Sequence, residues 1–94
     1  RGADGAQLVR PDGTWHAAAP RVEIVDTVGA GDASIGALLY SLMTWPERGG
    51  GEHLAFAVAA GTAACRLTGA RPPALDAVLA LAEVTAVRRD EARP

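Results

Sequence analysis

The 94-residue sequence contains no lysine, no asparagine and a single cysteine, Cys65. One cysteine excludes an internal disulfide framework and a zinc site built from cysteines. The absence of lysine excludes a P-loop, in which a lysine before Ser or Thr binds phosphate. Nine arginines and eleven acidic residues give a net charge of −2. This balance argues against a nucleic-acid partner and against a polybasic membrane-binding surface.

Aromatic residues and long apolar runs are also scarce. Aromatics make up 4% of the chain, although 49% is hydrophobic, and alanine alone supplies 21 of the 94 residues. No apolar run reaches the roughly 18 residues that a membrane-spanning helix needs. Residues 1–7 lack the apolar segment of a signal peptide. The sequence therefore predicts a cytoplasmic α/β protein without a membrane contact.

The pattern of apolar residues changes once along the chain. Alternation and turn residues predict three short strands, at 6–10, 14–18 and 22–25, the first two joined by a turn at Pro11, Asp12 and Gly13. Helical spacing then predicts helices over about 32–42, 52–68 and 74–88. The apolar positions that define the first and third helices are Ile35, Leu38, Leu39, Leu42, Leu75, Val78, Leu79 and Ala82.

Small residues fill the middle of the second predicted helix, so another element or a flat ligand could approach its backbone closely. The three glycines at 49–51 predict a flexible loop before it. Arg88 and Arg89 are expected in solvent at the end of the third helix, where they would complement its dipole.

Isolated aromatic, imidazole and thiol side chains are predicted to be structural. Trp15 and Trp45 flank turns and should anchor packing, and Cys65 should be a small core residue. His16 and His53 have no ligand partners nearby in the sequence, so we expect both in exposed positions.

Three helices on so few strands would leave one sheet face and one edge uncovered. We find no internal repeat and no second domain in the sequence. We therefore expect these residues to be part of a larger domain.

Residues 25–32, VDTVGAGD, carry the sharpest chemical signal. A strand end, a glycine turn and a helix start place converging backbone N–H groups and the positive end of a helix dipole together, which suits a phosphoryl group or another anion. Gly31 is expected to need a positive φ there. Asp32 could cap the helix or accept a proton from an attacking hydroxyl. A dinucleotide fingerprint is excluded, because Ser34 stands where its third glycine would be.

Residues 26–32, DTVGAGD, resemble the signature of the ribokinase-like (PfkB) carbohydrate kinases. Residues 2–5 look like the nucleotide-binding turn of that family, which a β-hairpin follows. The resemblance spans about 2–87 and corresponds to the last third of a family member. It implies a three-layer α/β/α fold in which residues 1–94 form the C-terminal nucleotide-binding and catalytic part of a single sugar-kinase domain, without its N-terminal part and lid.

The resemblance also implies roles for individual residues. Asp32 matches the catalytic base, and the amides of Gly29, Ala30 and Gly31 match an anion hole for the transferred phosphoryl group. The positions matching the ATP site are Gly2, Gly5, Val58, Ala59 and Gly69. The positions matching a monovalent-cation site are Asp26 and the carbonyls of Val28, Ala64, Leu67 and Gly69. The chain departs from the family pattern at Ser34, Val58 and Pro73, where an aromatic residue, Asn and Ser are common.

The function that these resemblances imply is ATP-dependent phosphorylation of a sugar hydroxyl, with a lean toward a fructokinase-like enzyme. The implied cofactors are ATP and Mg²⁺, together with a monovalent cation such as K⁺. The implied partners are a small sugar and, in the full-length protein, a second copy in a homodimer. Two alternatives remain open, a non-catalytic nucleotide- or anion-binding module and an inactive structural piece of the same fold. A carboxylate at Asp32 beside an anion hole favours the enzyme.

Overall fold

A computed structural model describes residues 6–20, 29–67 and 73–90 of the chain. Its elements are β1 (Ala6–Arg10), β2 (Gly13–Ala18), α1 (Ala30–Thr44), α2 (Gly50–Ala64), α3 (Leu75–Glu83) and β3 (Ala86–Arg89). The predicted hairpin and the three helical regions are confirmed. The strand predicted at 22–25 lies outside the described residues. Among the described residues, no helix is long and apolar enough to cross a membrane.

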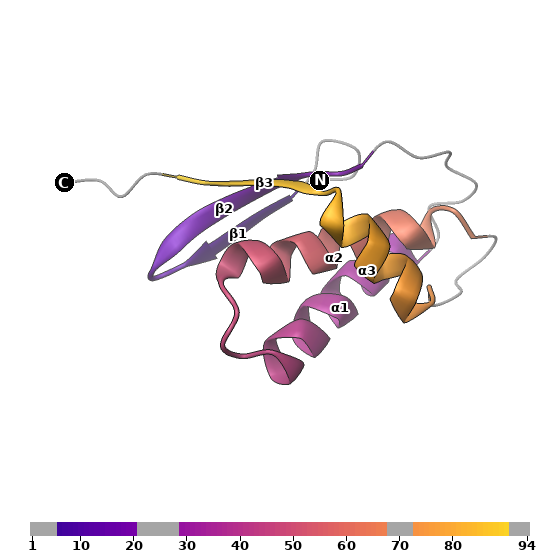
Figure 1. The fold of residues 1–94 in the computed structure, drawn as a ribbon, viewed down its shortest axis with the longest axis horizontal. Helices are drawn as coiled ribbons and strands as arrows, with labels where there is room; N and C mark the ends of the chain where they lie inside the picture. The colour runs from indigo at the N-terminus through magenta and orange to yellow at the C-terminus, as the bar shows by residue number, and fades with distance from the viewer. Residues whose placement is uncertain (1–5, 21–28, 68–72, 91–94) are drawn as a thin grey trace.

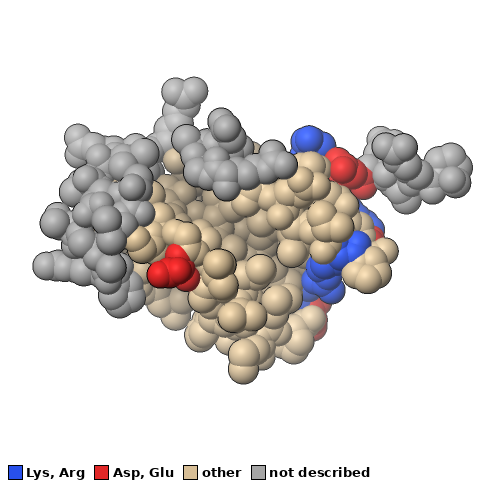
Figure 2. Space-filling view, turned by 180° about the vertical axis from the view of Figure 1, so that it is seen from behind, with Lys and Arg blue, Asp and Glu red and all other residues tan. Residues whose placement is uncertain are grey.

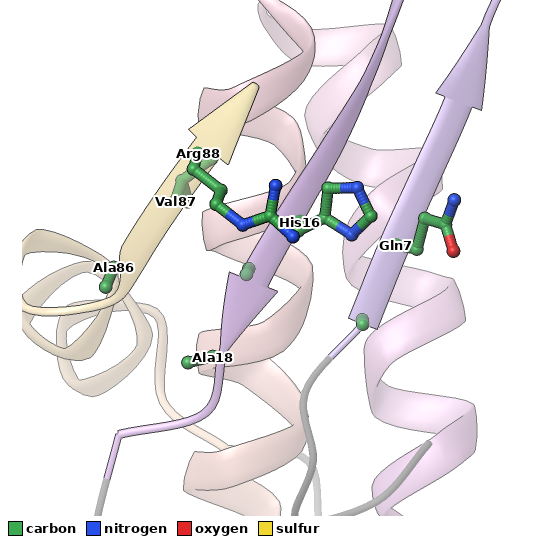
Figure 3. Close-up of a pocket in the computed structure, with 8 residues that line it drawn as sticks. Gln7, His16, Ala18, Ala86, Val87 and Arg88 are labelled. Atoms are coloured by element: carbon green, nitrogen blue, oxygen red, sulfur yellow. The ribbon is translucent and has the colours of Figure 1, made fainter. Parts of the chain in front are cut away.

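The three strands form one antiparallel sheet in the order β1-β2-β3. Trp15 and Ala17 of β2 are buried on the face that packs against the helices. Gln7, His16 and Arg88 pair across the three strands and lie on the opposite face, as Figure 3 shows. The alternation predicted for β2 therefore places its apolar side chains inward.

The helix predicted over 74–88 is too long, because α3 ends at Glu83. Residues 86–89 form strand β3 instead. The hydroxyl of Thr85 donates to the carbonyl of Leu81 at 2.8 Å, and the chain then turns to pair with the free edge of β2. Arg88 and Arg89 are therefore strand residues. The Arg89 guanidinium lies 5.2 Å from the centre of the Trp15 ring, where a cation meets the negative face of the aromatic system.

Helix α2 is the centre of the molecule and contacts every other element, as Figure 1 shows. Leu54 and Val58 pack on the sheet with Trp15 and Ala17. The opposite side of α2 packs against α1 and α3 in a second cluster, formed by Phe56, Ala59, Ala60, Ala63 and Val78. A helix buried on all sides needs small residues where neighbours approach, which explains its alanine content.

The glycines at 49–51 do not form the flexible loop that the sequence predicted. Gly49 is the N-cap of α2, and Gly50 and Gly51 are its first residues. Gly50 is buried, and a Cβ built there would lie 2.6 Å from the Trp15 ring. These glycines thus let the start of α2 lie directly against the indole.

The prediction that His53 is exposed is wrong, because the residue is 0% exposed. The Ser41 hydroxyl on α1 and His53 Nδ1 on α2 share a hydrogen bond of 2.6 Å. His53 Nε2 is buried without a partner among the described residues. His16 is half-buried, and its Nε2 lies 3.1 Å from the Asp90 carboxylate.

Helix α1 buries a single residue, Ser41, although it is 15 residues long. Ile35, Leu39 and Met43 are 63%, 55% and 83% exposed. On α3, Val78 is buried as predicted, but Leu75 and Leu79 are exposed. The sequence predicted an uncovered sheet face and edge, whereas most of the large apolar side chains that are exposed among the described residues lie on α1 and α3.

Candidate active site

The start of α1 has the geometry of an anion-binding turn. Gly29 is the N-cap and has φ 80° and ψ −1°, in the left-handed region that glycine adopts without strain. The first helical hydrogen bond runs from the Ala33 N–H to the Gly29 carbonyl at 2.9 Å. The amides of residues 30–32 therefore have no acceptor inside the helix and carry its positive dipole end. Positive φ falls on Gly29 and not, as predicted, on Gly31.

Asp32 is the third residue of α1 and is exposed to solvent. The N-cap of α1 is Gly29, three residues before Asp32. The helix-cap alternative is therefore wrong for this residue, although a carboxylate in the first turn still complements the helix dipole. A carboxylate without a structural partner among the described residues is free to act on a ligand.

Space next to the turn is open at Gly31, where a built Cβ would meet nothing within 4 Å. An anion bound by the helix amides could occupy this space. The residues present thus fit a phosphoryl group at the start of α1, with Asp32 beside it.

Close packing against α2 holds this turn in place. A Cβ built at Gly61 would lie 3.3 Å from the Ala30 carbonyl oxygen and would overlap the Ser34 side chain. The small side chain of Ser34 is therefore matched by a glycine on α2. Gly61 and the pair Ser41–His53 fix α1 on α2 at two separated points. The close approach at Gly61 confirms what the small residues of α2 predicted. Sequence reasoning missed the pair Ser41–His53, because it joins residues of different helices and leaves no periodic signal.

The remaining predicted site residues are only partly described. Gly2, Gly5, Asp26, Val28 and Gly69 lie outside the described residues. Val58 and Ala59 are buried in α2, at 7% and 0% exposure, with their side chains in the core. The contacts with adenine assigned to these two residues stay a prediction.

The cation site also stays a prediction. Ala64 is the last residue of α2, and its carbonyl accepts a hydrogen bond from the Leu67 N–H at 3.1 Å. A carbonyl oxygen has a second lone pair, so this bond does not prevent coordination of a cation. Within the described ranges, no three His, Cys, Asp or Glu side chains gather as a metal site.

The described part of the chain has hollows on two of its faces. A shallow one of about 420 Å³ lies on the outer face of the sheet, next to His16 and Arg88 (Figure 3). An apolar groove of about 390 Å³ lies between α1, α2 and α3 and is lined by Gly36, Tyr40 and Phe56, among others. Among the described residues that line them, neither hollow includes the turn at 29–32.

The pKa of the Asp90 carboxyl lies below its ordinary value, chiefly because His16 hydrogen-bonds to it. Arg88 Nη1 also donates to Asp90, at 2.9 Å. This charged cluster ties the end of β3 to β2 on the sheet face away from α1, and we assign it a structural role.

Comparisons with known proteins place this fold among kinases. The family model described as pfkB family carbohydrate kinase matches residues 1–77. The aminoimidazole riboside kinase of Salmonella typhimurium is 58% identical over 41 residues, 44% of this chain and 13% of that protein. The 1-phosphofructokinase of Escherichia coli K12 is 48% identical over 62 residues, 63% of this chain and 19% of that protein.

Solved structures agree with the family model. Phosphofructokinase-2 from E. coli, in complex with potassium, superposes with a TM-score of 0.79 and 31% identity over 88% of this chain and 26% of its own. An E. coli protein assigned as ribokinase II, in complex with ATP and Mg²⁺, gives a TM-score of 0.79 and 26% identity over 89% of this chain and 27% of its own.

The chain thus spans less than a third of the length of these relatives. Its mixed α/β fold matches part of their ribokinase-like structures, as the resemblance predicted. The family match covers the glycine turn, Asp32, helices α1 and α2 and the first residues of α3. The chain therefore belongs to the pfkB family of carbohydrate kinases.

Proposed function

We propose that this chain carries the catalytic base and the anion hole of an ATP-dependent sugar kinase. The observation that supports the proposal most strongly is the exposed carboxylate of Asp32, which has no partner among the described residues and lies in the first turn of α1, beside amides that have no acceptor in the helix. Membership in the pfkB family supports the same reaction.

In the proposed reaction, the Asp32 carboxylate accepts the proton of a sugar hydroxyl while that oxygen attacks the γ-phosphorus of ATP. The bond from the γ-phosphorus to the bridging oxygen breaks, and ADP leaves. The amides of Gly29, Ala30 and Gly31 donate hydrogen bonds to the oxygens of the transferred group, where negative charge is concentrated. When bound, Mg²⁺ neutralises phosphate charge, and a monovalent cation at Asp26 and its neighbouring carbonyls would supply a fixed positive charge near the turn.

The acceptor is proposed as a sugar hydroxyl, and a fructose-like ketose is the first candidate. The names of the relatives differ in their acceptor, since one is a riboside kinase and another a phosphofructokinase. A panel of ketoses, aldoses, sugar phosphates and nucleosides therefore tests the proposal. We also propose that the complete protein is cytoplasmic and forms a homodimer.

A non-catalytic nucleotide- or anion-binding module is the competing proposal. In this alternative, the same turn and the same helix amides bind the anion, but the Asp32 carboxylate has no role. A negative charge beside a bound phosphate would weaken binding. The unpaired carboxylate therefore favours catalysis over binding alone.

The test is Asp32→Asn in a complete pfkB kinase that carries residues 1–94 as the matching segment. We expect the turnover number to fall by about 10²–10⁴-fold, the usual contribution of a general base. ATP affinity should change by less than a few-fold, because a base acts in the transition state. The matched control is Asp76→Asn, which alters the acidic residue in the first turn of α3. Near-normal turnover of Asp32→Asn would refute the assignment.

A further inference from the structure

Gly61 is a buried residue in the last turn of α2. Glycine is less favourable than alanine inside a helix, so its presence in the core needs a reason. A Cβ built at Gly61 would overlap the Ser34 hydroxyl and would lie 3.3 Å from the Ala30 carbonyl oxygen. The missing side chain therefore lets the first turn of α1 lie directly against α2.

The two residues that meet Gly61 lie on either side of Asp32 in the sequence. Ala30 and Ser34 are four residues apart, so they share the face of α1 that meets α2. Asp32 is two residues from each, which is about 200° of helical rotation, so it lies on the opposite face. The exposures agree, because Ala30 and Ser34 are half-buried and Asp32 is exposed. Displacement of this turn away from Gly61 would therefore carry Asp32 with it.

The contact between the two helices is fixed at a second point. The 2.6 Å hydrogen bond between Ser41 and His53 lies about 10 Å further along α1 than Ser34. Because this hydrogen bond holds the far end, a side chain inserted at Gly61 would tilt α1 rather than shift the whole helix. The first turn of α1, which carries the proposed base, would move furthest.

Packing rather than charge holds the first turn of α1. Asp32 is the only charged residue of α1, and it forms no ion pair among the described residues. Figure 2 shows that charged side chains on the visible face gather toward one end of the molecule. Within the described ranges, a change in packing at Gly61 would therefore meet no charged contact that keeps Asp32 in place.

We propose that Gly61 is a positioning residue for the reaction, because its lack of a side chain sets how closely the first turn of α1 lies against α2. This distance determines where the Asp32 carboxylate stands relative to the phosphoryl group at the helix amides. The proposal rests on the proposed function. A misplacement of about 1 Å can lower a rate by about 10²-fold, so one added methyl group should disturb the reaction.

The test is Gly61→Ala in a complete pfkB kinase that carries residues 1–94 as the matching segment. We expect kcat to fall by about 10–100-fold. KM for ATP should change by less than a few-fold, because the base and the anion hole act in the transition state. Adding Ser34→Ala should restore kcat to within a few-fold of wild type, because the new methyl group then occupies the space of the removed hydroxyl.

The matched control is Gly50→Ala, at the other end of α2. A Cβ built at Gly50 would also be too close to a neighbour, but that neighbour is the Trp15 ring, at 2.6 Å on the sheet side of the helix. This substitution should lower the melting temperature and leave kcat of the folded enzyme within a few-fold. It therefore separates damage to the packing of α2 from displacement of α1.

A second variant and a second measurement make the test independent of one substitution. Ser34→Val presses on the same contact from α1, and it should lower kcat in the same way. The backbone amide NMR signals of Ala30 and Gly31 report the position of the first turn without any chemistry. They should shift in Gly61→Ala and return toward wild type when Ser34→Ala is added.

Wild-type kcat in both Gly61→Ala and Ser34→Val would overturn the proposal. A fall in kcat that Ser34→Ala does not relieve, or that Gly50→Ala shares, would overturn it as well, and so would unshifted amide signals. An active Asp32→Asn enzyme would refute the proposed function, whatever happens at Gly61. An inactive Asp32→Asn enzyme together with a fully active Gly61→Ala enzyme would refute the positioning role alone.

Discussion

Two glycines at the start of α1 differ in what they require of the backbone. Gly29 has φ 80°, whereas Gly31 is already a helical residue with open space where its Cβ would be. The sequence alone suggested that Gly31 needed the unusual conformation. In the structure, the residue with this conformation is Gly29, two residues earlier, because the helix begins at Ala30.

This difference predicts opposite effects of the same substitution. Gly29→Ala should destabilise the chain by about 1–2 kcal/mol, the cost of left-handed φ for a residue with a Cβ. Gly31→Ala should leave stability unchanged or raise it by up to about 1 kcal/mol, because alanine favours helix. Urea unfolding of the two variants checks this. Equal effects at both positions would show that the left-handed N-cap is not required.

At the scale of elements, a buried polar pair joins α1 to α2. Ser41 and His53 are 1% and 0% exposed, and their hydrogen bond lies inside the contact between the two helices. Because His53 Nε2 already lacks a partner among the described residues, loss of the Ser41 hydroxyl would leave both ring nitrogens unpaired.

We expect Ser41→Ala to lower the free energy of unfolding by about 1–3 kcal/mol, the cost of an unsatisfied buried group. In a His53→Leu background, the same substitution should cost much less, because no imidazole remains to be satisfied. A double-mutant cycle from urea unfolding measures the difference. Additive effects of the two substitutions would show that the pair contributes no coupling.

Strand β3 is held to β2 partly by charge. Asp90 interacts with His16 and Arg88, and the pKa of its carboxyl is lowered chiefly by the hydrogen bond with His16. A carboxyl whose pKa is lowered in the folded state stabilises that state at pH values above the ordinary pKa of the group. This stabilisation is lost as the pH falls through the lowered pKa.

Asp90→Asn should therefore lower the melting temperature near pH 5–6 but not at pH values well below 3.8, the ordinary pKa of the group. The effect should be small and should shrink in high salt, because the groups are exposed. Melting curves of both proteins across this pH range provide the measurement. If the two proteins differ in melting temperature by the same amount at pH 2, the effect of the substitution does not come from the charge of the Asp90 carboxylate.

For the whole molecule, we expect no sugar kinase activity from residues 1–94 alone. The proposed base is exposed, and the described residues lining the two hollows do not include it. Positioning of both reactants supplies much of the rate in phosphoryl transfer, and an open carboxylate cannot provide it. Coupled ATP consumption with saturating Mg²⁺ and K⁺ checks this expectation. Turnover that Asp32→Asn abolishes would contradict it.

The hairpin, the start of α1 and the family were predictable from residues that are close together in the chain. The Asp-Gly turn between alternating residues specified the hairpin, and VDTVGAGD specified the glycine turn and the start of α1. These features depend on neighbours in the chain, since turn chemistry and helix starts are set within a few residues. The family assignment followed from the same short segment, which the matching family model includes.

The contacts between elements were not predictable in this way, because they join residues far apart in the chain. Residues 86–89 became a strand because β2 offered an unpaired edge, and Gly49–Gly51 became ordered because Trp15 packs there. His53 was buried because Ser41 on another helix satisfied one of its nitrogens. Each outcome depends on contacts between residues 12 to 74 positions apart. Local propensity and periodicity do not contain such contacts, and burial of surface between distant elements outweighs propensity where the two disagree.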